Sequence, residues 1–231
     1  MEENVAICQR SFLLVSIIVL STASLFAQGE RKPEIFVGYS ILQAEAVTNG
    51  SVPSNVFGNS FLSDRASLHG ANVEGTVFPL GIAITGDLSF NRQKQSLDFG
   101  TGNASQKVDV TYFLGGPALY LPATDHLLPF VRIMAGGGHV GFNASTKTSG
   151  AAGSFSSSFS SGKTDFAMAF GGGLDVKVSE RFNVRALQID YAPIFLGDRS
   201  VAVIGQSGTP QLFTVSGQRQ DNFRFSFGVT F

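Results

Sequence analysis

The sequence predicts an all-β fold, an eight-stranded antiparallel up-and-down β-barrel, and three observations support this prediction. Apolar and polar residues alternate over segments of roughly ten residues, which is the side-chain period of a strand. The polar connections between these segments are alternately short and long. Glycine and phenylalanine are abundant, with 27 Gly and 22 Phe in 231 residues, whereas charged residues make up only 14%. This composition does not favour an ordinary soluble helical enzyme.

Residues 1–27 precede the first strand and are typical of a secretory signal peptide. An apolar stretch of nine residues, 12–20, is followed by small residues, and we expect cleavage after Ala27. The alternative is an uncleaved anchor helix, but the stretch is shorter than the roughly 20 residues that span a bilayer. The only cysteine, Cys8, lies inside this segment. Residues 28–231 are therefore expected to form one barrel domain without disulfides.

Eight segments alternate clearly enough to be predicted as strands. The apolar residues occupy odd positions in 35–41, 71–77, 131–135 and 223–231, and even positions in 82–91, 108–112 and 166–176. The remaining segment, 182–191, begins with even apolar positions and then breaks step. A β-bulge there would place Arg185, Gln188 and Asp190 on one face.

The connections between these strands alternate strictly in length. Those at 79–81, 121–128 and 179–181 are short, whereas those at 44–66, 93–106, 141–164 and 197–220 are long and polar. This alternation is typical of a barrel with tight turns at one end and mobile loops at the other. The serine-rich stretch 154–161 is expected to be a flexible exposed loop tip. The alternative is a surface for adhesion or phage contact, with Phe155 and Phe159 as anchors.

Periodicity alone does not say which set of residues faces outward. The apolar set contains bulky Phe, Ile and Val, whereas the polar set is rich in small residues, and an eight-stranded interior has room only for modest side chains. The polar set also contains charges of both signs, which could pair inside the barrel. We therefore predict a transmembrane barrel with the apolar set outside. Its predicted lumen charge network comprises Glu74, Asp87, Asp109, Arg132, Asp175, Lys177, Arg185, Asp190 and Arg224.

Residues 222–231 end the chain with an aromatic strand. It is preceded by two glycine-containing stretches, 129–138 and 171–175, and by the stretch 185–191 with Arg185, Asp190 and Tyr191. With these motifs the chain resembles the small outer-membrane β-barrel family of OmpA and OmpX type over residues 34–231. The resemblance implies a monomer in the cell outer membrane of a Gram-negative envelope, surrounded by outer-membrane lipid. It also implies periplasmic chaperones and the barrel-insertion machinery as partners during biogenesis. The implied insertion signal is Phe223, Phe225, Phe227 and Phe231.

Little in the sequence points to chemistry. A net charge of -1 does not favour a nucleic-acid partner. His69, His126 and His139 are scattered over different strands and turns without metal-ligand spacing, so we expect no metal, cofactor or catalytic residue and no enzyme. The predicted function is a structural or surface-display barrel whose lumen is filled by paired polar and charged residues. The alternatives are a small passive, porin-like channel for water or ions and a soluble periplasmic ligand-binding barrel.

Overall fold

The computed structural model of the chain describes residues 32–45, 65–79, 82–98, 102–121, 124–150, 153–204 and 210–231. The predicted signal peptide and most of the predicted loop 44–66 lie outside these residues. Within the described ranges, no helix has the length and hydropathy needed to cross a membrane.

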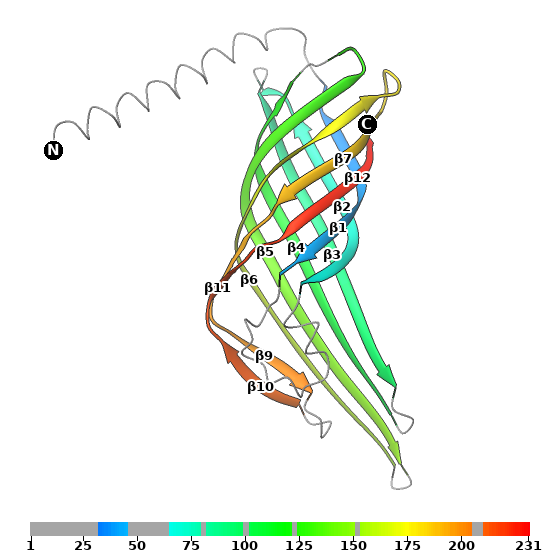
Figure 1. Cartoon of the computed structure of the whole chain (residues 1–231), viewed down its shortest axis with the longest axis vertical. Coiled ribbons are helices and arrows are strands. Elements are labelled where there is room, and N and C mark those ends of the chain that lie inside the picture. The colour runs from blue at the N-terminus through cyan, green and yellow to red at the C-terminus, as the bar shows by residue number, and fades with distance from the viewer. Residues whose placement is uncertain are drawn as a thin grey trace, which may run out of the picture.

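Eight antiparallel strands close into a ring, which confirms the predicted fold (Figure 1). Each strand pairs with the next in the chain, β7 pairs with β12, and β12 pairs with β1 to complete the circle. Closure leaves the ring without a free edge. The ring strands are β1 (Glu34–Ala44), β2 (Ala66–Val77), β3 (Ala83–Asp98), β4 (Gly102–Tyr120), β5 (Leu127–Gly150), β6 (Gly153–Lys177), β7 (Asn183–Tyr191) and β12 (Phe223–Thr230).

Four shorter strands lie between β7 and β12 in the chain. The strand β8 (Ile194–Leu196) pairs with β6 and with β11 (Gln218–Gln220), while β9 (Arg199–Ile204) pairs with β10 (Pro210–Val215). Together they form a hairpin at the end of the barrel from which the long β3–β4 and β5–β6 hairpins extend (Figure 1). We call this end the loop side and the opposite end, with the short connections and Phe231, the turn side.

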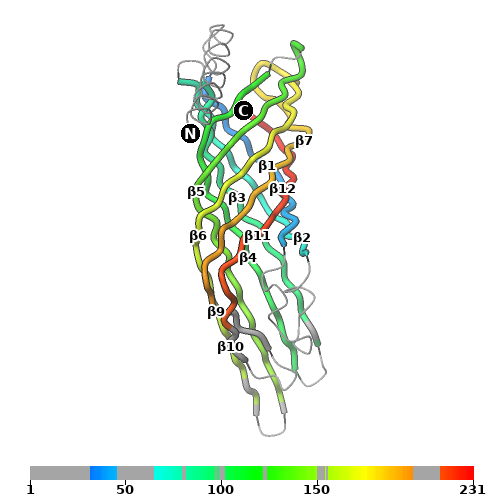
Figure 2. The backbone as a smooth tube through the Cα atoms, turned by 60° about the vertical axis from the view of Figure 1, so that its left-hand side comes forward, coloured from blue at the N-terminus to red at the C-terminus, as the bar shows by residue number. Residues whose placement is uncertain are grey.

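Two of the predicted long loops are strands for most of their length. The pairing of β3 with β4 continues to Asp98 opposite Asn103, and that of β5 with β6 to Gly150 opposite Gly153. Both hairpins therefore extend well beyond the barrel (Figure 2). The expectation of a flexible tip at 154–161 was wrong, because regular cross-strand pairing satisfies the backbone hydrogen bonds of this serine-rich segment.

The predicted bulge in β7 is present. Ala186 and Leu187 are both exposed, and the register of β7 shifts against both neighbouring strands at this point. As a result Arg185, Gln188 and Asp190 all point into the barrel, where each is buried.

Candidate functional site

The outer face of the ring is apolar over its turn-side half. Large apolar side chains from all eight ring strands are exposed there, many to about half of their surface. We call these side chains the apolar belt. It includes Ile35, Val73, Leu88, Phe113, Ile133, Phe166, Ile189 and Phe227.

The lumen of the same half contains charged side chains. Seven of the nine predicted residues meet there, each with its side chain no more than 2% exposed. We call this group the lumen network. It consists of Glu74, Asp87, Arg132, Asp175, Arg185, Asp190 and Arg224.

One end of the lumen network lies around Arg185. Its Nε donates to Asp175 Oδ1 at 2.7 Å, and its Nη1 donates to Glu74 Oε2 at 2.6 Å. The other oxygen of Glu74 lies 2.7 Å from Nη1 of Arg132. Glu74 therefore bridges two guanidinium groups that come from β7 and β5.

The chain of ion pairs continues from Arg132 to the other side of the lumen. Arg132 Nη2 donates to Asp190 Oδ2 at 2.7 Å, and the same oxygen accepts from Arg224 Nη2 at 3.0 Å. Arg224 also donates to both oxygens of Asp87, at 2.8 Å each. Positive and negative groups thus alternate from Asp175 to Asp87, so every buried charge has an opposite neighbour.

Aromatic rings complete the surroundings of Arg185. Its guanidinium carbon lies 4.3 Å from the ring centre of Phe36 and 4.4 Å from that of Phe130. These rings need space that only glycine leaves: a Cβ on Gly38 would lie 2.3 Å from the Phe36 ring, and one on Gly173 would lie 2.8 Å from the Phe130 ring. Gly38 and Gly173 therefore leave room for the aromatic rings that surround Arg185.

Several uncharged polar residues join the network, and sequence reasoning singled out only Gln188 among them. Gln188 donates to Glu74 and Asp190, Asn72 donates to Glu74, and Ser89 accepts from Arg224. In the sequence these residues were distinguished only by their alternation with apolar residues. Alternation assigns a residue to one face of its strand but does not identify its hydrogen-bond partner.

Asp109 and Lys177 do not belong to the network, so these two predictions were wrong. Asp109 points outward on β4 and pairs with Arg92 and Lys107. In β4 the apolar residues Val108, Val110 and Tyr112 face inward and are buried, contrary to the assumed orientation. Lys177 is the last residue of β6, and its side chain is exposed at the turn side.

Clusters of buried apolar side chains lie on both sides of the charges. The turn-side layer consists of Phe78, Ala83, Ala118, Tyr120 and Phe130. The loop-side layer is larger and includes Leu42, Leu68, Val108, Val110, Leu114, Met134, Val140, Phe142, Ile194 and Leu196. Tyr112 belongs to this layer and donates its hydroxyl to the carbonyl of Ala192.

The three histidines do not belong to the lumen network. His69 hydrogen-bonds to the hydroxyl of Tyr39 and His139 to that of Thr164, both on exposed surface, while His126 is exposed before β5. Within the described residues, no group of three or more His, Cys, Asp or Glu side chains could hold a metal ion. The phenylalanines of the C-terminal strand face outward: Phe223, Phe227 and Phe231 are exposed and Phe225 is half-buried.

No family model and no curated protein matches the sequence. Solved structures with a similar fold include Ail, the attachment invasion locus protein of Yersinia pestis, with a TM-score of 0.43 and 13% identity over 86% of this chain and 97% of that one. Neisserial surface protein A gives 0.43 and 9% over 88% and 98%, and OprG from Pseudomonas aeruginosa gives 0.41 and 10% over 86% and 93%. The closed register of its own strands shows that the chain folds as an eight-stranded antiparallel β-barrel.

Proposed function

We propose that this chain is a structural barrel of the outer membrane, with a sealed lumen and a display surface on its extended hairpins. The apolar belt supports the membrane location, because the large apolar side chains that the eight ring strands expose would otherwise be in water. The same observation disfavours a soluble periplasmic barrel, whose apolar side chains would point inward.

The main support for a sealed lumen is the order of the layers of side chains inside the barrel. Paired charges occupy the middle, and clusters of buried apolar side chains lie on both sides of them. An ion crossing the lumen would have to displace a guanidinium from its carboxylates and then cross an apolar layer. Breaking one buried pair costs about 3–5 kcal/mol. This arrangement favours a structural role over a small channel.

Planar-bilayer recording of the folded chain tests this proposal. A band on gels that migrates differently after boiling first shows that the barrel has folded in detergent. The bilayer is then expected to show no reproducible current steps, and a pore-forming protein added afterwards shows that the membrane reports openings. Stable, discrete openings of the unchanged chain would establish the channel instead.

Two matched double variants test whether the lumen network is what prevents ions from passing. Arg132→Ser with Arg224→Ser removes two guanidinium groups from the lumen, whereas Arg92→Ser with Arg65→Ser removes two from the exposed outer surface. Among samples with the folded band, only the lumen pair is expected to give any current. Equal currents from both pairs would mean that the lumen network does not form the barrier.

A further inference from the structure

We propose that the outward face of β3, β4 and β5, directly beyond the apolar belt, binds the phosphate groups of anionic lipid headgroups. The proposal rests on the membrane location proposed above and assigns this face a specific partner. Its outward residues include Arg92, Lys94, Lys107 and Lys147 with Asp98 and Asp109, a net charge of +2.

Two of the cations are direct neighbours of like charge. Lys94 on β3 lies opposite Lys107 on β4, and both face outward. Like charges at directly opposed positions destabilise a sheet. Asp109 lies 3.2 Å from Lys107 Nζ and also pairs with Arg92, so one carboxylate is shared by two cations. An additional anion at Lys94 and Lys107 would remove the repulsion between them.

The cations lie at the depth of a headgroup layer. Phe90 is the last exposed aromatic residue of the apolar belt on β3, and the guanidinium carbon of Arg92 lies 4.8 Å from the centre of its ring. Lys94 is two residues farther along the same face, which adds about 7 Å of strand. A tilted strand therefore holds Arg92, Lys94 and Lys107 within about 10 Å of the hydrocarbon boundary, where anionic lipids carry their phosphates.

Arg65, at the same boundary, lies beside an aromatic ring as Arg92 does. The guanidinium carbon of Arg65, just before β2, lies 5.7 Å from the ring centre of Phe223 on β12. Phe223, like Phe90, is an exposed aromatic residue of the apolar belt. Aromatic rings of the belt and cations beside them thus recur at the loop-side boundary.

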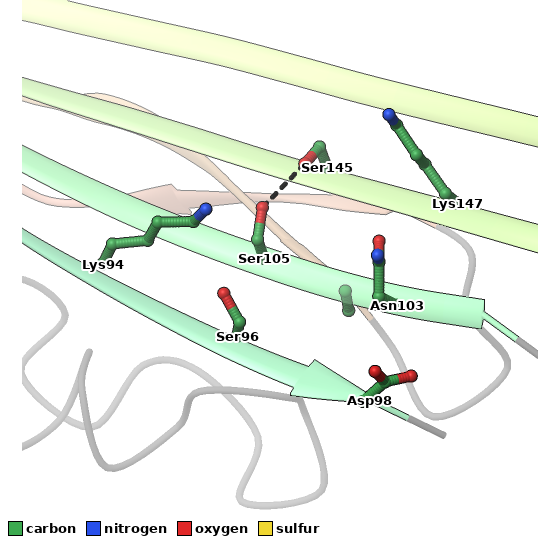
Figure 3. Close-up of a pocket in the computed structure, with 8 residues that line it drawn as sticks. Lys94, Ser96, Asp98, Asn103, Ser105, Ser145 and Lys147 are labelled. Atoms are coloured by element: carbon green, nitrogen blue, oxygen red, sulfur yellow. Dashed lines mark hydrogen bonds between the residues drawn. The ribbon is translucent and has the colours of Figure 1, made fainter. Parts of the chain in front are cut away.

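The face also has shallow hollows beside the cations. One, of about 420 Å³, is lined by Lys94, Ser96, Ser105, Ser145 and Lys147 among others, and Figure 3 shows these side chains on three neighbouring strands with the Ser105–Ser145 hydrogen bond. Another, of about 490 Å³, lies where Gly141 and Gly162 are opposed, next to Phe90, Asp109 and His139. Hydroxyl and amide groups beside ammonium groups suit a phosphorylated sugar headgroup.

Native mass spectrometry of the full chain, folded in non-ionic detergent, tests the proposal. The probe is lipid A carrying two phosphates, compared with the same lipid without phosphate. Each Lys near an anionic surface contributes about one kcal/mol, so Lys94→Gln with Lys107→Gln is expected to weaken binding of the phosphorylated lipid roughly thirtyfold. The control, Lys177→Gln with Arg181→Gln, removes two cations from the turn side and is expected to leave the affinity unchanged.

The outcomes separate this proposal from the membrane location. Equal affinity of the two double variants for the phosphorylated lipid, or equal binding of the lipid without phosphate, would overturn the headgroup assignment. Full competition by inorganic phosphate, or binding of a soluble sulfated polysaccharide that needs Lys94 and Lys107 while lipid A does not bind, would overturn it as well. Loss of the heat-dependent gel shift in the unchanged chain would instead reject the membrane barrel itself.

Discussion

In the turn-side half of the barrel the outward residues are apolar and the inward residues include the charged lumen network, whereas in the loop-side half many inward residues are apolar and the outward residues are mostly polar. Strand β5 shows both arrangements on one continuous strand. Ile133 points outward beside the buried Arg132, and farther along, Asn143 points outward beside the buried Phe142. Side-chain parity stays the same while the surroundings change from a proposed lipid phase to water. The position of the belt boundary therefore decides which residue type each face receives.

The largest effect is expected from removing one guanidinium group of the lumen network. Arg224→Ala leaves Asp87 and Asp190 with Arg132 as their remaining guanidinium partner, and we expect a loss of about 3–5 kcal/mol in the free energy of unfolding. Arg92→Ala on the outer face is the control and should cost less than about 1 kcal/mol, because its side chain is 48% exposed. Urea unfolding in detergent measures both. Similar losses would mean that the two ion-pair groups have similar surroundings.

A charge placed on the outer face of β5 locates the belt boundary. Ile133→Arg is expected to lower the free energy of unfolding in a bilayer by about 2–4 kcal/mol, since Ile133 is 56% exposed in the middle of the apolar belt. Asn143→Arg, on the same face of the same strand, should change it by no more than about 0.5 kcal/mol. Unfolding in lipid vesicles tests the pair. A comparable loss at Asn143 would move the boundary past this residue.

Two single substitutions at neighbouring positions test the same comparison in the loop-side half. Val110→Thr adds a hydroxyl to a fully buried apolar layer and should cost about 1–3 kcal/mol. Thr111→Val makes the reverse change on the outward face and should lie within about 0.5 kcal/mol of the unchanged chain. The midpoint of urea unfolding compares them. If Thr111→Val were the costlier change, the orientation of β4 would be opposite.

The smallest effect concerns a group outside the belt. Hydrogen bonds from Arg219 and Tyr191 lower the pKa of Asp221, which lies between β11 and β12. A lowered folded-state pKa means that this carboxylate adds stability above its unfolded value of about 4, and that the contribution is lost as the pH falls through the folded value. Asp221→Asn should therefore flatten the acid side of the stability profile slightly. An unchanged profile would show that the contact is not made in solution.

The sequence allowed the ring of eight strands, the β7 bulge and most of the lumen network to be predicted, because alternation identifies a face even without partners. It failed at Asp109 because the apolar set was taken to point outward along the whole of every strand. The pattern Val108–Asp109–Val110 is the same for a strand in lipid and for one in water, and only the depth of the strand distinguishes them. The lengths of the β3–β4 and β5–β6 hairpins were missed for a related reason, since serine and glycine are equally compatible with a loop and a water-exposed strand.

The lumen network also has a consequence for the order in which the barrel is assembled. Its links join residues that are distant in the chain: 111 residues separate Glu74 from Arg185, and 137 separate Asp87 from Arg224. Arg224 comes from the last strand, β12, which enters between β7 and β1. Until β12 pairs, Asp87 and Asp190 have only Arg132 as a guanidinium partner. Pairing of β12 therefore both closes the ring and gives these carboxylates their second guanidinium partner.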